Sequence, residues 1–90
     1  MKQVMPSHVF SLQGATCSVY YANKGEGLPM HSHIYDHTSV CVSGSCVLRK
    51  DGKELVINKY SQPVLLTAPN AHEIEALENN TCFVNMLVSM

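Results

Sequence analysis

The chain has 90 residues, of which 46% are hydrophobic and 14% charged, a composition that predicts one folded domain spanning residues 1–90. The formal net charge is -1 and the basic residues are isolated apart from Arg49-Lys50, so we expect no nucleic-acid partner. No apolar run reaches the ~18 residues of a membrane-spanning helix, and residues 1–10 lack the apolar run of a secretory signal. We therefore expect a cytoplasmic protein with no membrane partner.

Taken in order, the chain alternates short β-forming runs with turns, and no stretch shows the 3.6-residue period of a helix. Residues 23–29 (NKGEGLP) are expected to form a loop. Asp51-Gly52 predicts a tight hairpin turn, because both residues tolerate the positive φ of a type I′ turn. This spacing of strands predicts an all-β sandwich or barrel. The expected strands are 8–12, 16–22, 31–33, 38–42, 46–50, 54–58, 64–68, 73–77 and 81–89.

Three of the five histidines lie in the segment HSHIYDH, at residues 31–37. In an extended strand, residues i and i+2 share a face, so His31 and His33 would point to the same side. A tight turn over residues 34–36 would bring His37 back beside that pair, and His72 follows a later strand. An isolated histidine on a strand is commonly just exposed or hydrogen-bonded, but the offsets of all four predict that they share one metal ion.

The order Gly27, His31-x-His33, His37, Gly44 resembles the first motif of the cupin superfamily, although the family commonly has Glu where this chain has His37. That replacement resembles the four-histidine minority of small cupins. Of the second cupin motif only His72 is present. The resemblance covers roughly residues 25–75 and implies a double-stranded β-helix, or jelly-roll barrel, with a metal in its mouth. It also implies a homodimer, but not a particular reaction, because one fold hosts many functions.

Four neutral imidazoles would leave a divalent transition metal (Fe, Mn, Ni, Cu or Zn) with its full charge, which favours anionic ligands. An octahedral ion would keep two open positions, enough for a bidentate substrate or for a substrate with dioxygen. We therefore predict a metal-dependent dioxygenase or related oxidoreductase acting on a small oxygen-rich molecule. The alternatives are a non-enzymatic module that binds a small molecule or anion, a metal-dependent isomerase or lyase, and a closed structural zinc site.

Further side chains are weaker candidates. The candidates for lining the pocket are Met30, Tyr35, Cys41 and Met86, for which ordinary packing is the alternative. His8 is expected to be exposed. Glu26, Asp36, Glu73 and Glu75 are expected at the surface, although one of them could orient an imidazole.

The four cysteines form no C-x-x-C pair, and at least Cys17, Cys46 and Cys82 are expected to be buried, reduced thiols. Apolar residues occupy both faces of the runs 38–42 and 81–88. A barrel of this size has one interior, so the second apolar face needs another cover, which predicts a homodimer.

Overall fold

The computed structural model describes residues 1–68 and 70–88, and the side chains of all these residues except Val88. The described residues form strands without helices, so none of them provides a helix that could cross a membrane. The strands are β1 (Lys2–Gln3), β2 (His8–Leu12), β3 (Ala15–Ala22), β4 (Glu26–His31), β5 (His37–Ser43), β6 (Ser45–Lys50), β7 (Lys53–Asn58), β8 (Val64–Leu66), β9 (His72–Ala76) and β10 (Thr81–Val88).

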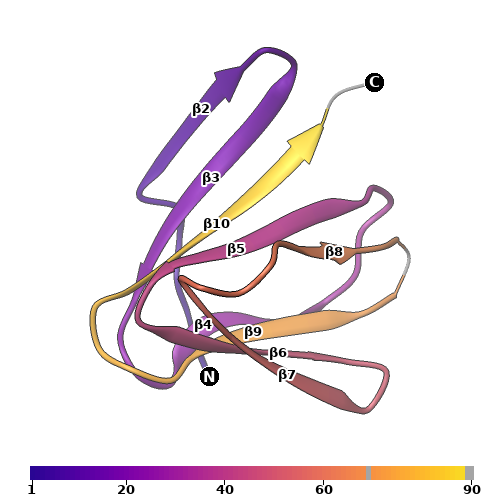
Figure 1. Ribbon diagram of the computed structural model, residues 1–90. Helices are drawn as coiled ribbons and strands as arrows, with labels where there is room; N and C mark the ends of the chain where they lie inside the picture. Colours follow the sequence, from indigo (N-terminus) through magenta and orange to yellow (C-terminus); the bar gives the residue numbers. More distant parts are fainter. Residues whose placement is uncertain (69, 89–90) are drawn as a thin grey trace.

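The strands make two five-stranded sheets that face each other (Figure 1). We call the sheet with the order β1-β4-β9-β6-β7 the first sheet, and the sheet with the order β2-β3-β10-β5-β8 the second sheet. Consecutive strands change sheets repeatedly, for example from β3 to β4, from β4 to β5 and from β5 to β6. This arrangement is a jelly roll, which confirms the fold expected from the sequence.

Most of the expected strands are present, and their ends lie within about two residues of the expected ones. The predicted end of the last strand at Ser89 lies outside the described residues. The prediction of a loop over residues 23–29 is wrong from Glu26 onward, because β4 begins there. Gly27 is needed for close packing rather than for a turn: a Cβ at this position would overlap the backbone carbonyl of Ile74 on β9. The start of the chain also contains a short strand, β1, which pairs in parallel with β4.

The predicted hairpin between the histidines is also wrong. His31 is the last residue of β4 in the first sheet, and His37 is the first residue of β5 in the second sheet. Residues 32–36 therefore cross between the sheets, and His33 lies in this crossing rather than on a strand. The histidines meet because the two sheets face each other, not because one strand folds back on its neighbour.

The apolar core lies between the sheets and is centred on Phe83, Ile57 and Leu66, which are almost fully buried. Phe83 stacks on Tyr20 with 4.9 Å between the ring centres. The four cysteines are free and buried, as expected for Cys17, Cys46 and Cys82. Cys41 points into the core, where its sulfur lies 3.9 Å from that of Cys46, and it does not line the cavity described below. Burial raises the pKa of the Cys46 thiol, so this group stays protonated.

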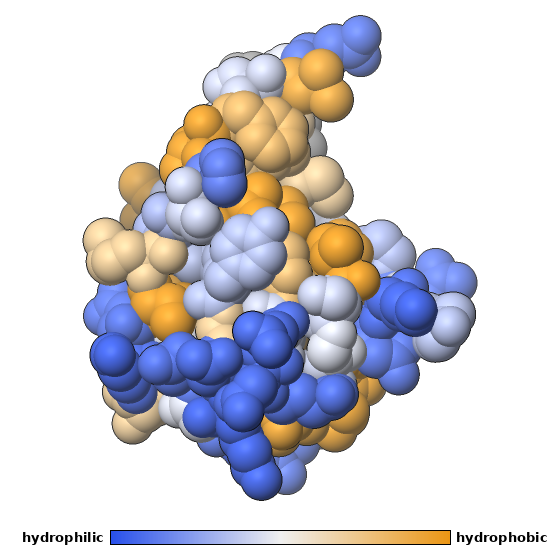
Figure 2. Space-filling view, turned by 90° about the vertical axis from the view of Figure 1, so that its left-hand side faces the viewer, coloured by the Kyte–Doolittle hydropathy of each residue, from blue (hydrophilic) through white to orange (hydrophobic). Residues whose placement is uncertain are grey.

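The outer face of the second sheet is apolar. The strands of this sheet contain no Asp, Glu, Lys or Arg within the described residues, whereas charged residues occur in every strand of the first sheet. In Figure 1 the β2–β3 hairpin and the end of β10 extend beyond the first sheet. Figure 2 shows the side of the molecule that lies on the left in Figure 1, with hydrophobic residues mainly in its upper half and hydrophilic residues mainly below. The large hydrophobic side chains exposed on the strands of the second sheet include Phe10, Leu12, Tyr21, Val42 and Leu65.

Candidate metal centre

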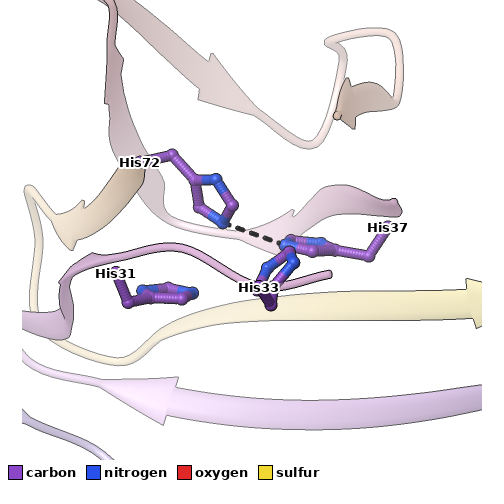
Figure 3. Close-up of side chains that lie close together, drawn as sticks. All are labelled: His31, His33, His37 and His72. Carbon is purple, nitrogen blue, oxygen red and sulfur yellow. Dashed lines mark hydrogen bonds between the residues drawn. The ribbon is translucent and has the colours of Figure 1, made fainter. Parts of the chain in front are cut away.

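The structure brings His31, His33, His37 and His72 together at one end of the sandwich (Figure 3). Each ring offers a nitrogen, and the four nitrogens lie within 4.8 Å of one another. His31 and His72 come from neighbouring antiparallel strands, β4 and β9, and are directly paired. The remaining two reach the same point from the crossing segment and from the start of β5.

Backbone pairing and one side-chain contact hold these histidines in place. His37 pairs with Leu66 on β8, which fixes the start of β5. In the crossing segment, Asp36 accepts a hydrogen bond of 2.8 Å from the backbone N–H of Ala68, just after β8. The crossing that carries His33 is therefore tied to the connection that leads toward β9 and His72.

Each imidazole uses its Nδ1 for a partner two residues away along the chain. In three rings this partner is a backbone carbonyl, which can only accept, so Nδ1 must carry the proton and Nε2 must carry the lone pair. In His37 the partner is the Ser39 hydroxyl, 3.5 Å from Nδ1. The three carbonyl contacts are His31 to Pro29 at 2.8 Å, His33 to Tyr35 at 2.7 Å and His72 to Asn70 at 3.1 Å.

The free Nε2 atoms fit a transition-metal ion. Those of His37 and His72 are 3.1 Å apart, the separation expected at about 2.1 Å from a shared ion with a right angle between the bonds. The Nε2 of His33 is buried without any hydrogen-bond partner, which costs free energy unless a ligand uses it. Nitrogens on opposite sides of one ion are about 4.2 Å apart, so the 4.8 Å span requires only a small inward movement of the rings.

The surroundings of His37 and His72 keep these two imidazoles neutral. Burial, followed by the proximity of His33, His72 and His31, lowers the pKa of His37 to about 4. Burial is also the largest cause that lowers the pKa of His72, and His31 adds to it. At neutral pH both rings are therefore unprotonated, which is the state that binds metal. Neutral imidazole suits Zn, Cu, Fe and Ni.

A cavity of about 460 Å³ opens beside three of the four rings, those of His31, His33 and His37. The side chains that line it are uncharged when the imidazoles are neutral. Two expected pocket residues, Met30 and Tyr35, line it, and the Tyr35 ring stacks on that of His33. The polar groups of the wall are those of Gln3, Thr16, Ser18, Tyr20, Tyr35 and Asn85.

The expectation that Met86 lines the pocket is wrong. The register of β10 places Met86 opposite Cys17 and Thr38, whereas Asn85 and Leu87 line the cavity. The sequence does not reveal which residues of β10 point inward. The pairing of β10 with β5 shifts in register between Cys82 and Phe83, and the inner face of β10 carries a polar residue, Asn85. Sequence reasoning missed Asn85 and also Ser39, although Ser39 lies in phase with His37. It missed the other polar residues of the cavity wall as well, which are Gln3, Thr16, Ser18 and Tyr20.

The predicted surface charges lie away from the imidazoles. Arg49 forms ion pairs with Glu54, Glu73 and Glu75 on the first sheet. Glu26 accepts a hydrogen bond from the backbone of Asn23. Within the described part of the chain, the rings are held by backbone carbonyls and Ser39 rather than by a carboxylate. His8 is exposed on β2, as expected.

Comparison with solved structures identifies the fold as that of the cupins. A cupin superfamily protein from Desulfitobacterium hafniense has 13% sequence identity and a TM-score of 0.78, over 98% of this chain and 79% of that protein. A conserved protein of unknown function from Streptococcus pyogenes has 19% identity and a TM-score of 0.79, over 99% and 76% of the two chains. KdgF from Halomonas sp. has 13% identity and a TM-score of 0.81, over 92% and 76%.

No family model matches the chain, and the search of curated proteins also found no match. The solved structures therefore establish the double-stranded β-helix, while the four clustered histidines define the candidate metal site within it.

Proposed function

We propose that the protein binds one divalent transition metal ion through His31, His33, His37 and His72. We further propose that it acts as a metal-dependent dioxygenase or related oxidoreductase on a small oxygen-rich molecule. The observation that carries the proposal is the convergence of four imidazole nitrogens beside a cavity, with the Nε2 of His33 buried and unpartnered. When bound, such an ion supplies Lewis-acid and redox chemistry.

The residues of the chain contribute three things to this chemistry. The four imidazoles add no negative charge, so the centre keeps the full charge of the ion and favours anionic ligands. The carbonyls bonded to Nδ1 fix three of the rings in the tautomer that presents Nε2. The cavity gives a substrate access to the side on which His31, His33 and His37 lie.

A second candidate function is non-enzymatic binding of a small molecule or anion. It is favoured by the composition of the cavity wall, which contains no Asp, Glu or Lys side chain among the described residues. A metal-dependent isomerase or lyase would need a general base to move a proton, so the same observation ranks that alternative lower. A closed structural zinc site is also less favoured, because three of the four rings border the cavity.

Elemental analysis of the purified protein and of the variant His33→Ala tests metal binding. We expect about one equivalent of metal in the wild type and at least tenfold weaker binding in the variant, because loss of a partner outside the ligand set alone costs 10–100-fold. His8→Ala is the matched control, since His8 lies exposed on β2. Equal metal content in wild type and His33→Ala would refute the site.

Oxygen consumption separates the two candidate functions. The metal-loaded protein is incubated with a panel of diketones, phenols, thiols and sugar acids, and oxygen uptake is recorded. Uptake with one of these classes supports the oxidoreductase. Tight binding of a compound without any chemical change supports the binding module instead.

We also propose that the protein forms a homodimer through the outer face of the second sheet. Because the described strands of this sheet contain no Asp, Glu, Lys or Arg and expose several large hydrophobic side chains, two copies can pack through this face without burying an unpaired charge. Sedimentation should show a dimer that Phe10→Lys on β2 converts to a monomer. Val56→Lys on β7 of the first sheet is the control, because Val56 is similarly exposed on the opposite side of the sandwich. A wild-type monomer would refute the proposal.

A further inference from the structure

A row of polar side chains crosses the inner face of the second sheet beside the histidines. Asn85 on β10 is paired in register with Ser18 on β3 and with Ser39 on β5. Ser39 follows His37 by two residues and shares its face, and it is only 1% exposed. Ser18 and Asn85 line the cavity, while Ser39 lies behind them, next to the ring of His37.

The Ser39 hydroxyl connects the candidate metal ligand His37 to the cavity wall. Its Oγ lies 2.6 Å from Oδ1 of Asn85, and because an amide oxygen can only accept, the hydroxyl hydrogen is donated there. Toward His37 the same oxygen therefore acts as an acceptor, 3.5 Å from Nδ1. This direction agrees with the tautomer of the other three rings, in which Nδ1 carries the proton.

The hydrogen bond from Ser39 also determines which group of the Asn85 amide remains free to bind a ligand. Its oxygen is used by Ser39, so its two N–H groups remain as donors. The hydrogen bonds of the described residues give them no protein partner, and Asn85 borders the cavity. A buried serine thus holds a hydrogen-bond donor at the edge of a cavity whose other walls carry no fixed positive charge.

We propose that Asn85 is a specificity-determining residue that donates a hydrogen bond to the ligand of the metal centre. The ligand class is a small anion with at least two oxygen acceptors, such as a 2-oxo acid or a dicarboxylate. This inference rests on the proposed metal site. A +2 ion with four neutral ligands selects a negatively charged oxygen and repels a nearby cationic substituent, for which the cavity wall offers no Asp or Glu partner. Asn85 then distinguishes ligands that place a second acceptor beside the ion from those that do not.

The experiment measures binding of oxalate to the Co²⁺-loaded protein through the change in the visible spectrum. Asn85→Asp keeps an oxygen for Ser39 but replaces the donor with a carboxylate oxygen. We expect oxalate affinity to fall by at least about tenfold in this variant, because a hydrogen bond to a charged group is lost and the added carboxylate repels the anion. Asn85→Ala separates loss of the donor from the added negative charge, and it should weaken oxalate binding about three- to tenfold.

Imidazole, a neutral ligand with a single donor atom, is the reference probe. Its affinity for the Co²⁺-loaded protein should change less than about twofold in both variants, which also shows that they are folded and hold the metal. Asn79→Asp is the matched control, because it makes the same change of side chain outside the cavity and should leave oxalate affinity within about twofold.

Two results would overturn the inference. If wild type binds Co²⁺ but oxalate binds equally well to wild type and to both Asn85 variants, Asn85 is not the donor and the metal site stands. If wild type binds no Co²⁺, the proposed metal function fails, and the role of Asn85 fails with it. Selective loss of oxalate binding supports the inference.

Discussion

The metal-free protein should lose stability when the pH falls from 7.5 to 5. Folding lowers the pKa of His37 from the ordinary 6.5 to about 4, so between these values the unfolded chain binds more protons than the folded one. Stability therefore rises with pH across this window and is lost as the pH falls through it. The main cause is burial of the ring, which is only 6% exposed.

The size of the effect follows from the two pKa values. A group that titrates near 6.5 when unfolded and near 4 when folded lowers the free energy of unfolding by about 2 kcal/mol at pH 5 relative to pH 7.5. His72, whose pKa is also lowered, adds to the loss in the same direction. Carboxylates with ordinary pKa values near 4 titrate mainly below this window.

Urea unfolding in the presence of a chelator, at pH 7.5, 6 and 5, measures this dependence. His37→Gln should remove most of the slope, because the neutral amide does not titrate. Tyr60→Phe is the control and should keep the slope of the wild type, since Tyr60 is exposed and does not line the cavity. If the wild type is equally stable at pH 7.5 and 5, or if His37→Gln keeps the full slope, burial of a neutral His37 is the wrong explanation.

Three further predictions concern the core and the site. Gly27→Ala should cost about 1–3 kcal/mol, because its Cβ would overlap the carbonyl of Ile74; unchanged urea unfolding would contradict this packing. Phe83→Ala, at a fully buried position, should cost about 3–5 kcal/mol, and a loss below about 1 kcal/mol would place the core elsewhere. Free metal at 100 times its Kd should stabilise the wild type by about 2.7 kcal/mol. A chelator should remove that gain, and His72→Ala, with metal binding at least tenfold weaker, should show at most about half of it at the same metal concentration; an equal gain in this variant would exclude His72 as a ligand.

The sequence predicted the strands well, because short β-forming runs bounded by Gly, Asp and Asn allow few other structures. The prediction failed at glycine and proline, which are typical of loops but also occur in strands. Gly27 and Pro29 look like loop residues, yet they lie on β4, where Gly27 allows the backbone of β9 to come close. The two-residue strand β1 is too short to leave a pattern in the sequence.

The candidate site was predicted from spacing, but by a route that the structure corrects. The four histidines do converge, although His33 lies in a crossing between sheets and not on a strand. Asn85 could not be singled out, because a single polar residue in an apolar strand gives no sign of which face it occupies. Only the pairing of β10 with β5 places it next to Ser39.

The histidines reach their common point from both layers of the sandwich, His31 and His72 from one and His37 from the other. An ion held there would act as a cross-link at the end of the molecule that the apolar core does not fill. Loss of the ion would then release the two layers locally, and backbone amides of β4, β5 and β9 near the histidines would exchange with solvent before those around Phe83. Metal binding and the local rigidity of the cavity mouth would thus be coupled, so that a change in one would change the other.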